Sequence, residues 1–258
     1  NDFEFIHRYF KKHDQDVSVI KGIGDDAAII KTSKGHNLVI STDTLLEGVH
    51  FPTKMSPHDI GYRCVAVNIS DMAAMGATPR WLTLALSLPR FNQEWLENFS
   101  LGLFAAAKEY KVTLVGGDTT SGQQLTITIS ITGEVKSNSA ITRARARPGD
   151  LLFVTGTIGD AAAGLSLIGD TNTLGEDEQL LMERFSRPSA RIEVGQSLLD
   201  IASAAIDVSD GLFADTGKLL KASGVGGSIN VNQIPFSQSM TNLYSFEKRQ
   251  EFQTYHVS

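Results

Sequence analysis

The stretch that decides the fold runs from Lys21 to His50 and reads KGIGDDAAIIKTSKGHNLVISTDTLLEGVH. A pair of glycines is followed at once by two adjacent carboxylates, Asp25 and Asp26. A short apolar run and a turn then lead to a strand, expected at 38–42, that ends in the polar residues Ser41 to Thr44. Glycine and carboxylate at the ends of apolar segments are a pattern that returns along the chain.

Further carboxylates stand where the sequence predicts that an apolar segment gives way to a loop. They are Asp71 in SDMAAMG, Asp118 in GGDTTSG, and Asp207 and Asp210 in DVSDG. Mg²⁺ takes oxygen ligands, usually one or two carboxylates with water and substrate phosphates. Glycine lets the backbone approach a ligand and supplies N–H groups to phosphate oxygens. The pattern predicts carboxylates gathered around a metal-bridged polyphosphate. The six candidate ligands are Asp26, Asp43, Asp71, Asp118, Asp207 and Asp210.

A structural interpretation of these residues stays open. Asp and Gly are also the ordinary residues of turns and helix N-caps, and a single pair most often has no further role. The adjacent Asp25 and Asp26 and the D-x-x-D of Asp207 and Asp210 favour a metal, because close carboxylates repel each other unless a cation lies between them. The G-x-G-x-x-A spacing of residues 22–27 matches a weak dinucleotide fingerprint, which we reject because two aspartates would face the pyrophosphate.

Other motifs are absent or weaker. The sequence contains neither GxxxxGK[ST] nor the HRD and DFG motifs of protein kinases, and its histidines and single cysteine lack metal-ligand spacing. The segment from Gly156 to Asp160 could bind an anion at a helix N-terminus, but a strand-to-helix turn capped by Asp160 is the more ordinary interpretation. Cys64 lies on the apolar face of a predicted helix, which favours core packing over nucleophilic catalysis.

Three single residues are candidates for contact with a phosphorylated substrate. His50 follows the strand that carries Asp43, and Arg143 lies at an expected domain junction, where a guanidinium could bind phosphate in a bidentate manner. Ser209 stands between two aspartates and could donate to a phosphate or cap the helix that begins near Gly211. For each of the three, a purely structural role stays open.

Composition excludes several classes of protein. Of the 258 residues, 41% are hydrophobic and 20% charged, which is typical of a soluble globular protein with a core. The formal charge of −6 gives no support for sequence-independent binding to nucleic acid. A single cysteine excludes an internal disulfide and fits a reducing compartment. No apolar run approaches the roughly 20 residues of a membrane span, and the first residues contain no signal-peptide h-region. We expect a cytoplasmic protein with no membrane or nucleic-acid partner.

Alternating strand and helix patterns predict an α/β or α+β fold with helices on one side of a sheet. A polar, basic segment with a Pro-Gly pair, residues 137–150, places the expected boundary between domains at residues 1–139 and 140–258. Strands are expected at 38–42, 81–88, 113–115, 125–134, 151–155, 204–206 and 227–231. Helices are expected at 57–76, 92–110, 160–168, 190–201 and 211–223.

Six blocks of the sequence together resemble one family. They are GIGDDAAI (22–29), STDTLLEGVHF (41–51), AVNISDMAAMGATPRWLTLALSLP (66–89), GGDTTSG (116–122), RPGDLLFVTGTIGDAAAGL (147–165) and IDVSDGL (206–212). In this order, over nearly the whole chain, they resemble the thiamine-monophosphate kinases, in the superfamily of aminoimidazole ribonucleotide synthetase and selenophosphate synthetase. The resemblance implies a two-domain α/β fold of the aminoimidazole ribonucleotide synthetase type, whose N-terminal sheet pairs into a barrel across a homodimer.

The resemblance also implies a reaction: direct in-line transfer of a phosphoryl group from ATP to thiamine monophosphate, giving thiamine diphosphate, with several Mg²⁺ ions. The implied metal ligands are Asp26, Ser41, Thr42, Asp43, Asp71, Asp118, Asp207 and Asp210. The implied ATP contacts are Gly117, Asp118, Arg143 and Ser209, and the implied contact to thiamine monophosphate is His50. No catalytic side chain is implied beyond the metal ligands, because the acceptor is a phosphate oxygen that is already ionised at neutral pH.

The family continues with a GGEDYEL segment and a strand-helix portion ending in an aromatic substrate contact, which the resemblance implies would follow Ser258. One alternative is another ATP-dependent member of the superfamily with a different acceptor. Selenophosphate synthetases are disfavoured, since no cysteine precedes Cys64. The other alternative is a divalent-cation-binding protein without enzymatic activity, although the twelve-residue EF-hand spacing is absent.

Overall fold

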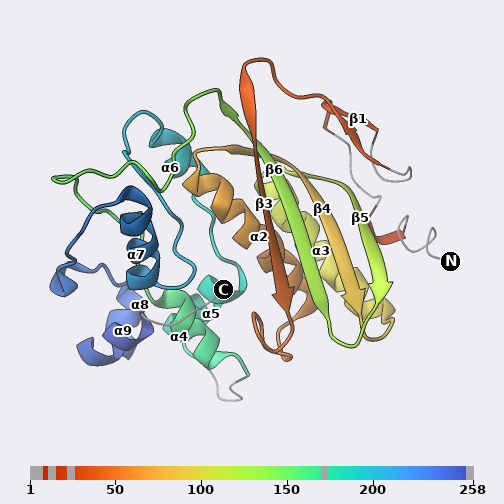
Figure 1. Ribbon diagram of the computed structural model, residues 1–258. Coiled ribbons are helices and arrows are strands. Elements are labelled where there is room, and N and C mark those ends of the chain that lie inside the picture. Colours follow the sequence, from red (N-terminus) through yellow and green to blue (C-terminus); the bar gives the residue numbers. More distant parts are fainter. Residues whose placement is uncertain (1–7, 11–15, 22–26, 170–173, 254–258) are drawn as a thin grey trace. The chain divides into compact units, whose positions relative to one another are not determined.

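The computed structural model describes residues 8–10, 16–21, 27–169 and 174–253. The chain separates into two compact units, one formed by residues 1–72 with 77–138 and the other by residues 73–76 with 139–258. The first unit is built on a β-sheet, and the described part of the second is built on short helices (Figure 1). Among the described residues, no helix is long and apolar enough to cross a membrane.

The first unit contains a four-stranded sheet in the order β3-β6-β4-β5. Strands β3 (His36–Leu46), β6 (Thr126–Lys136) and β4 (Thr78–Leu88) pair antiparallel. Strand β5 (Thr113–Ser121) pairs parallel to β4, and the chain between them forms α3 (Gln93–Glu109), because a parallel pair needs a crossover connection. β3 and β5 are therefore the two edges of the sheet.

Helices α2 (Pro57–Ala74) and α3 cover one face of this sheet (Figure 1). Strand β6 alternates isoleucine with threonine or serine, and its three isoleucines are fully buried on the covered face. Helix α3 begins where it was predicted to begin, because the Asn92 side chain accepts a hydrogen bond from the Trp95 backbone N–H, 3.0 Å long. The main core lies between these helices and the sheet, and the mixed α/β class is confirmed.

The two helices of this layer touch backbone to backbone. A Cβ atom added to Gly61 of α2 would lie 2.1 Å from the Phe99 carbonyl oxygen, and one added to Gly102 of α3 would lie 1.8 Å from the His58 carbonyl oxygen. Residues with a larger side chain would force the helices apart. The position of α2 over the sheet therefore depends on these glycines.

A two-stranded hairpin, β1 (Val19–Lys21) and β2 (Ile29–Ile30), packs against the sheet near Trp81. Val19, Trp81 and Val115 form a small apolar cluster, and Ile30 packs against it. The Trp81 indole N–H donates to the hydroxyl of Ser18, with a distance of 2.9 Å. The segment between the two strands, residues 22–26, lies outside the described residues.

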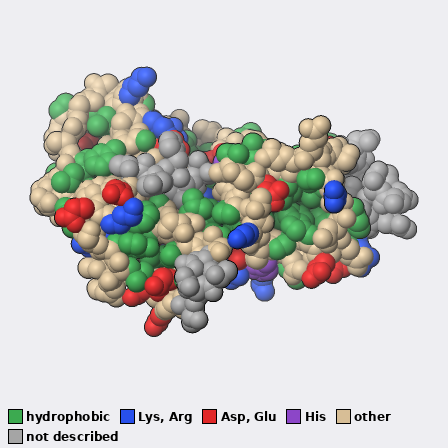
Figure 2. Space-filling view, turned by 90° about the horizontal axis from the view of Figure 1, so that it is seen from below, with side chains coloured by type: hydrophobic (Ala, Val, Ile, Leu, Met, Phe, Trp, Pro, Cys, Tyr) green, Lys and Arg blue, Asp and Glu red, His purple; other side chains and the backbone are tan. Residues whose placement is uncertain are grey.

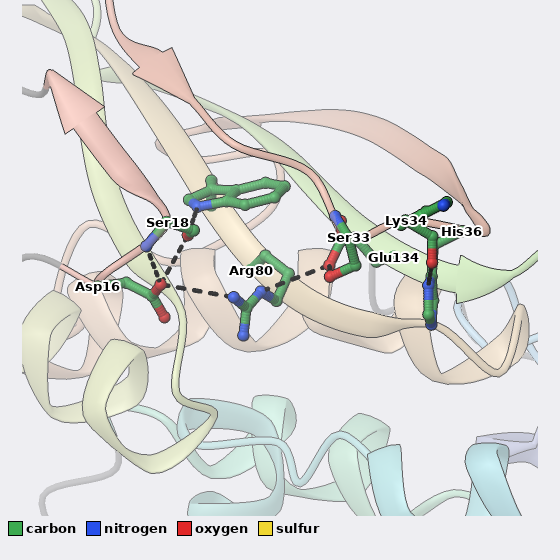
Figure 3. Close-up of polar contacts among 8 residues, drawn as sticks. Asp16, Ser18, Ser33, Lys34, His36, Arg80 and Glu134 are labelled. Carbon is green, nitrogen blue, oxygen red and sulfur yellow. Dashed lines mark hydrogen bonds and ion pairs between the residues drawn. The ribbon is translucent and has the colours of Figure 1, made fainter.

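A charged network around Arg80 holds both flanks of this hairpin (Figure 3). Arg80 Nη2 lies 3.4 Å from Asp16 Oδ1, and its Nε lies 3.8 Å from Glu134 Oε2. Before β1, Asp16 accepts from the backbone N–H and the hydroxyl of Ser18 at 2.8 and 2.6 Å. After β2, Glu134 accepts from the backbone N–H and the hydroxyl of Ser33 at 2.6 and 2.8 Å. One guanidinium therefore lies between the carboxylates that bind the two flanks.

Six helices and one 3₁₀ turn are seen in the described part of the second unit. They are α4 (Asp160–Leu167), α5 (Glu176–Ser186), α6 (Ile192–Ser197), α7 (Leu212–Ser223), η1 (Val231–Gln233), α8 (Gln238–Leu243) and α9 (Phe246–Phe252). Their core includes Ala163, Leu181, Met240 and Phe252. Helices α5, α8 and α9 were not expected from the sequence.

Three strands expected in the second half do not form in the described part of this unit. Segments 151–155, 204–206 and 227–231 have strand-like composition, but none forms a ladder there. A strand exists only where a neighbour accepts its hydrogen bonds, and composition does not supply that neighbour. Leu151 and Phe153 accordingly remain 78% and 81% exposed. The helix expected at 190–201 is also shorter, since only α6 forms there.

Charges are mixed on the surface. On the face shown in Figure 2, the coloured acidic and basic side chains are interspersed with neutral and apolar ones. The surface exposes some large apolar side chains, among them Leu38, Ile40 and Ile201.

Gly102→Ala is expected to lower the midpoint of thermal unfolding, because the new methyl group would overlap the His58 carbonyl. Overpacking of this kind typically costs about 1–3 kcal/mol. The matched control is Gly217→Ala in α7, where an added Cβ meets nothing within 4 Å. Its expected effect is a gain of up to about 1 kcal/mol from helix propensity. Calorimetry of both variants checks this; equal midpoints would show that α2 and α3 are not held by backbone contact.

Candidate active site

Ser41, Asp43 and Asp71 form the one group of predicted ligands that the described part of the first unit brings together. Strand β3 does not end at residue 42, as expected, but continues to Leu46, so Ser41 and Asp43 lie within it. Both point toward the covered face, because alternate residues of a strand share a face. Asp71 lies in the last turns of α2, within the helix expected at 57–76, and the Ser41 hydroxyl donates to its Oδ2 at 2.5 Å.

The environment of Asp43 disfavours its charged form. Burial raises the pKa of the Asp43 carboxyl, and the nearby negative charge of Asp71 raises it further. A cation between the two carboxylates would offset the repulsion by Asp71. It would also reduce the penalty of burial, because it would replace lost solvation. The two side chains therefore form an arrangement that favours a bound cation.

Asp118 lies on the other face of the same sheet. It is within β5 instead of the expected loop, and the register aligns it with Ala85, Thr128 and Thr44. Asp43 belongs to the neighbouring row of side chains, which faces the helices. β3 and β5 are also opposite edges, about 14 Å apart for three strand spacings. The Asp118 side chain therefore does not join Asp43 and Asp71 within this sheet.

Thr42 also faces the uncovered side of the sheet, where its hydroxyl donates to Ser130 Oγ at 3.0 Å. Its side chain thus points away from those of Ser41 and Asp43. Gly117 precedes Asp118 in β5 with a φ of 155°, and a Cβ there would lie 1.9 Å from the Leu84 carbonyl oxygen. Glycine is therefore required at this position by the approach of β4.

His50 lies in a tight turn directly after β3. The Leu46 backbone N–H donates to His50 Nδ1 at 3.0 Å, and the Gly48 N–H donates to the Phe51 carbonyl at 2.8 Å. A ring nitrogen that accepts a hydrogen bond carries no proton, so the neutral imidazole has its proton on Nε2. His50 can therefore present a single donor, Nε2–H, to a ligand.

The remaining predicted residues lie elsewhere. Asp26 is outside the described residues, as is Asp25. Arg143, Asp207, Ser209 and Asp210 belong to the second unit. The Arg143 side chain is exposed, and its carbonyl accepts from the Ser223 hydroxyl at 2.6 Å.

Asp215 and Lys218 are two residues of the second unit that the sequence reasoning missed. Asp215 Oδ2 accepts from the backbone N–H groups of Ser209 and Asp210, both at 2.9 Å, and Asp215 Oδ1 accepts from Lys218 Nζ at 2.8 Å. Lys218 Nζ also contacts the Asp210 carboxylate. The hydrogen bonds to Asp210 and Asp215 raise the pKa of Lys218. An acidic residue in the first turn of a helix, with lysine three residues later, was the available signal.

Two weaker candidates have structural roles. Asp160 is buried at the start of α4, where its carboxylate accepts from the hydroxyls of Thr157 at 2.6 Å and Ser237 at 2.7 Å. The anion site considered for this helix is thus occupied by the chain's own carboxylate. Cys64 is fully buried, its thiol donates to the Gly61 carbonyl, and burial raises the pKa of the thiol.

The chemistry of the donors can be tested against Mg²⁺. The described residues contain no group of three or more His, Cys, Asp or Glu side chains that could hold a metal. Asp43 and Asp71 with the Ser41 hydroxyl provide only oxygen, and Mg²⁺ commonly uses one or two carboxylates with water and substrate phosphates. The residues present therefore fit Mg²⁺, provided that water and the phosphates of a nucleotide supply its remaining ligands.

Sequence comparison decides the family. The family model for the N-terminal domain of AIR synthase related proteins matches residues 24–135. The family model for their C-terminal domain matches residues 147–251. The thiamine-monophosphate kinase of Buchnera aphidicola subsp. Schizaphis graminum is 45% identical over 251 residues, which is 96% of this chain and 77% of that protein. The Escherichia coli K12 enzyme is 46% identical over 243 residues, 93% of this chain and 74% of that protein. The chain belongs to the thiamine-monophosphate kinase family.

Solved structures agree with this family. The thiamine-monophosphate kinase of Stenotrophomonas maltophilia K279a is 40% identical with a TM-score of 0.87, covering 94% of this chain and 78% of that one. The structure "AaThiL complexed with AMPPCP and TMP" is 32% identical with a TM-score of 0.81, covering 98% and 80%. The two-domain fold expected from the resemblance is therefore confirmed.

Asp43→Asn is expected to raise the unfolding midpoint of the metal-free protein at pH 7. Because the pKa of Asp43 is raised in the folded state, its ionisation destabilises the fold increasingly as pH rises above the ordinary value of 3.8. The difference should vanish below that pH, where both side chains are neutral. Added MgCl₂ should stabilise the wild type more than the variant.

Glu94→Gln is the matched control, since it removes an exposed carboxylate of α3, in the same unit, that is not a candidate ligand. Thermal melts from pH 3 to 8, with and without MgCl₂, make the comparison. A lower midpoint for Asp43→Asn at pH 7 would contradict the expectation, because it would show that the charge stabilises the metal-free fold.

Proposed function

We propose that this chain transfers a phosphoryl group from ATP to thiamine monophosphate and so forms thiamine diphosphate. The observation that carries the proposal is the group of Ser41, Asp43 and Asp71 in a chain of this family. A relative 32% identical to this chain forms a complex with AMPPCP, an ATP analogue, together with TMP. A nucleotide and an acceptor held together are what direct transfer requires.

Phosphoryl transfer depends mainly on positioning and on the neutralisation of charge. Mg²⁺, when bound, would neutralise phosphate charge and help to align the transferred group. In the proposed site, Asp43 and Asp71 hold the cation and the Ser41 hydroxyl fixes the direction of Asp71 by donating to it. His50 donates from Nε2 to thiamine monophosphate. No side chain has to remove a proton, because the acceptor oxygen is already ionised.

The rest of the proposed site comes from the family resemblance. We assign Asp26, Asp207 and Asp210 as further metal ligands. Thr42 and Asp118 face the other side of the sheet from Asp43 and Asp71, so we assign them to a different one of the several Mg²⁺ ions. Gly117, Asp118, Arg143 and Ser209 are assigned as ATP contacts. We also assign the domains to residues 1–139 and 140–258. A cytoplasmic location belongs to the proposal as well, since ATP is the donor and Cys64 is a free thiol.

A homodimer is part of the same proposal. The face of the sheet opposite the helices carries Thr42 and Thr44, and it exposes 45% of Leu38 and 65% of Ile40. A second copy that packs its own sheet on this face would cover these side chains and close the two sheets into a barrel. Thr42 and Asp118 would then lie inside the assembly.

With MgATP, the chain is expected to release ADP only when thiamine monophosphate is present, and thiamine diphosphate should appear in equal amount. Chromatographic separation of the products measures both. Asp43→Asn should form neither product while it remains folded, because the cation site loses a carboxylate. Equal turnover with aminoimidazole ribonucleotide precursors would support a different acceptor. Stabilisation by Mg²⁺ without any turnover would support a cation-binding protein without enzymatic activity.

Two variants of His50 distinguish the role of Nδ1 in the turn from the role of Nε2 in binding the substrate. His50→Asn keeps an acceptor near the Leu46 N–H but lacks the Nε2 donor, so its unfolding midpoint should stay near that of the wild type. Its KM for thiamine monophosphate should rise at least about tenfold, because the free energy of a hydrogen bond to a charged group is lost. His50→Gln offers an amide donor near Nε2 and should retain more affinity with a lower midpoint. The opposite order of KM values would show that His50 only supports the turn.

A further inference from the structure

The loop that carries Ser209 and Asp210 is held from inside the following helix. Gly211, the N-cap residue of α7, has no side chain with which to cap the helix. Asp215, in the first turn, instead reaches back and accepts from the N–H groups of Ser209 and Asp210 at 2.9 Å each. Asp215 is 1% exposed. A buried carboxylate that binds two successive amides fixes both peptide planes.

The same carboxylate also determines where Lys218 lies. Asp215 Oδ1 accepts from Lys218 Nζ at 2.8 Å, and the same ammonium contacts the Asp210 side chain. Lysine three residues after aspartate lies on the same face of the helix, so the pair forms within α7. Asp210 is thus held twice, through its backbone N–H by Asp215 and through its carboxylate by Lys218.

We propose that Asp215 is a positioning residue that, with Lys218, fixes the direction in which Asp210 is presented to a cation-bound nucleotide. This inference rests on the proposed function, in which Asp210 is a metal ligand and Ser209 an ATP contact. Asp215 itself does not touch the substrate. Its carboxylate is engaged by two amides and an ammonium, and it acts through the geometry of the loop.

Burial alone would also make Asp215 important for stability, so the test needs a control that is also buried. Asp160 provides it, because it lies in the same unit, is 5% exposed, and accepts from two hydroxyls at the start of α4. Its partners, Thr157 and Ser237, are not candidate ligands. Asp160→Asn should therefore lower stability without changing how Asp210 is presented.

The experiment measures binding of Mn²⁺ with AMPPCP to the full chain, by electron paramagnetic resonance, for the wild type, Asp215→Asn, Lys218→Met and Asp160→Asn. Asp215→Asn should weaken binding at least about tenfold, because an amide has only one acceptor oxygen, which is uncharged, and its NH₂ group cannot accept from Lys218. Lys218→Met should weaken it less, because both amide contacts remain. Asp160→Asn should bind as the wild type does. All four proteins are compared well below their unfolding midpoints.

Two further readouts separate positioning from stability. The amide hydrogens of Ser209 and Asp210 should exchange faster in Asp215→Asn than in Asp160→Asn. KM for ATP should rise in Asp215→Asn, whereas KM for thiamine monophosphate should stay unchanged. Wild-type binding of Mn²⁺ and AMPPCP by Asp215→Asn, or equal weakening in Asp160→Asn, would overturn the inference.

The binding measurement distinguishes this inference from the proposed function, because it needs no turnover. If the wild type binds Mn²⁺ with AMPPCP but phosphorylates no thiamine monophosphate, the proposed function fails, and weaker binding by Asp215→Asn still supports the positioning role. If the wild type forms thiamine diphosphate while Asp215→Asn binds and turns over normally, the proposed function stands and the positioning role is rejected.

Discussion

The candidate site depends on one constraint, the alternation of side chains along β3 beneath the helices of the first unit. Successive residues of a strand point to opposite faces, and α2 covers only one face of the sheet. Ser41 and Asp43 therefore meet Asp71, while Thr42 meets Ser130 on the other side. Gly61 and Gly102 let α2 and α3 touch backbone to backbone, so they set the lateral position of α2, and with it that of Asp71, on this face.

Local patterns in the sequence predicted the first unit well. In the second unit they placed helices α4 and α7 within one residue of their ends, but the strands expected there do not form in its described part. Strand β6 and helix α3 carry strong signals, namely regular alternation and the Asn92 cap, and both lie where they were expected. The end of β3 was misplaced, because consecutive hydroxyls resemble a loop until β6 supplies a partner as far as Leu46. The strand expected at 151–155 failed for the same reason, since pairing depends on residues far away in the sequence.

The chemistry of the site was predicted by residue type, and its geometry was not. The sequence identified Asp43, Asp71 and Asp118 as candidate ligands, but only the register of the sheet shows that Asp118 faces the other side. Asp215 escaped notice because a carboxylate in the first turn of a helix is common for electrostatic reasons alone. Its contacts with a loop upstream become visible only in three dimensions.

The buried thiol of Cys64 gives this protein an internal reporter of its own opening. The side chain lies in the middle of α2, and burial both hides it and raises its pKa. A maleimide or disulfide reagent can react only with an exposed thiolate, so labelling must await transient exposure of the helix. Because Cys64 is the single cysteine of the chain, the rate at which the labelled mass appears reports how often α2, the helix that carries Asp71, becomes exposed.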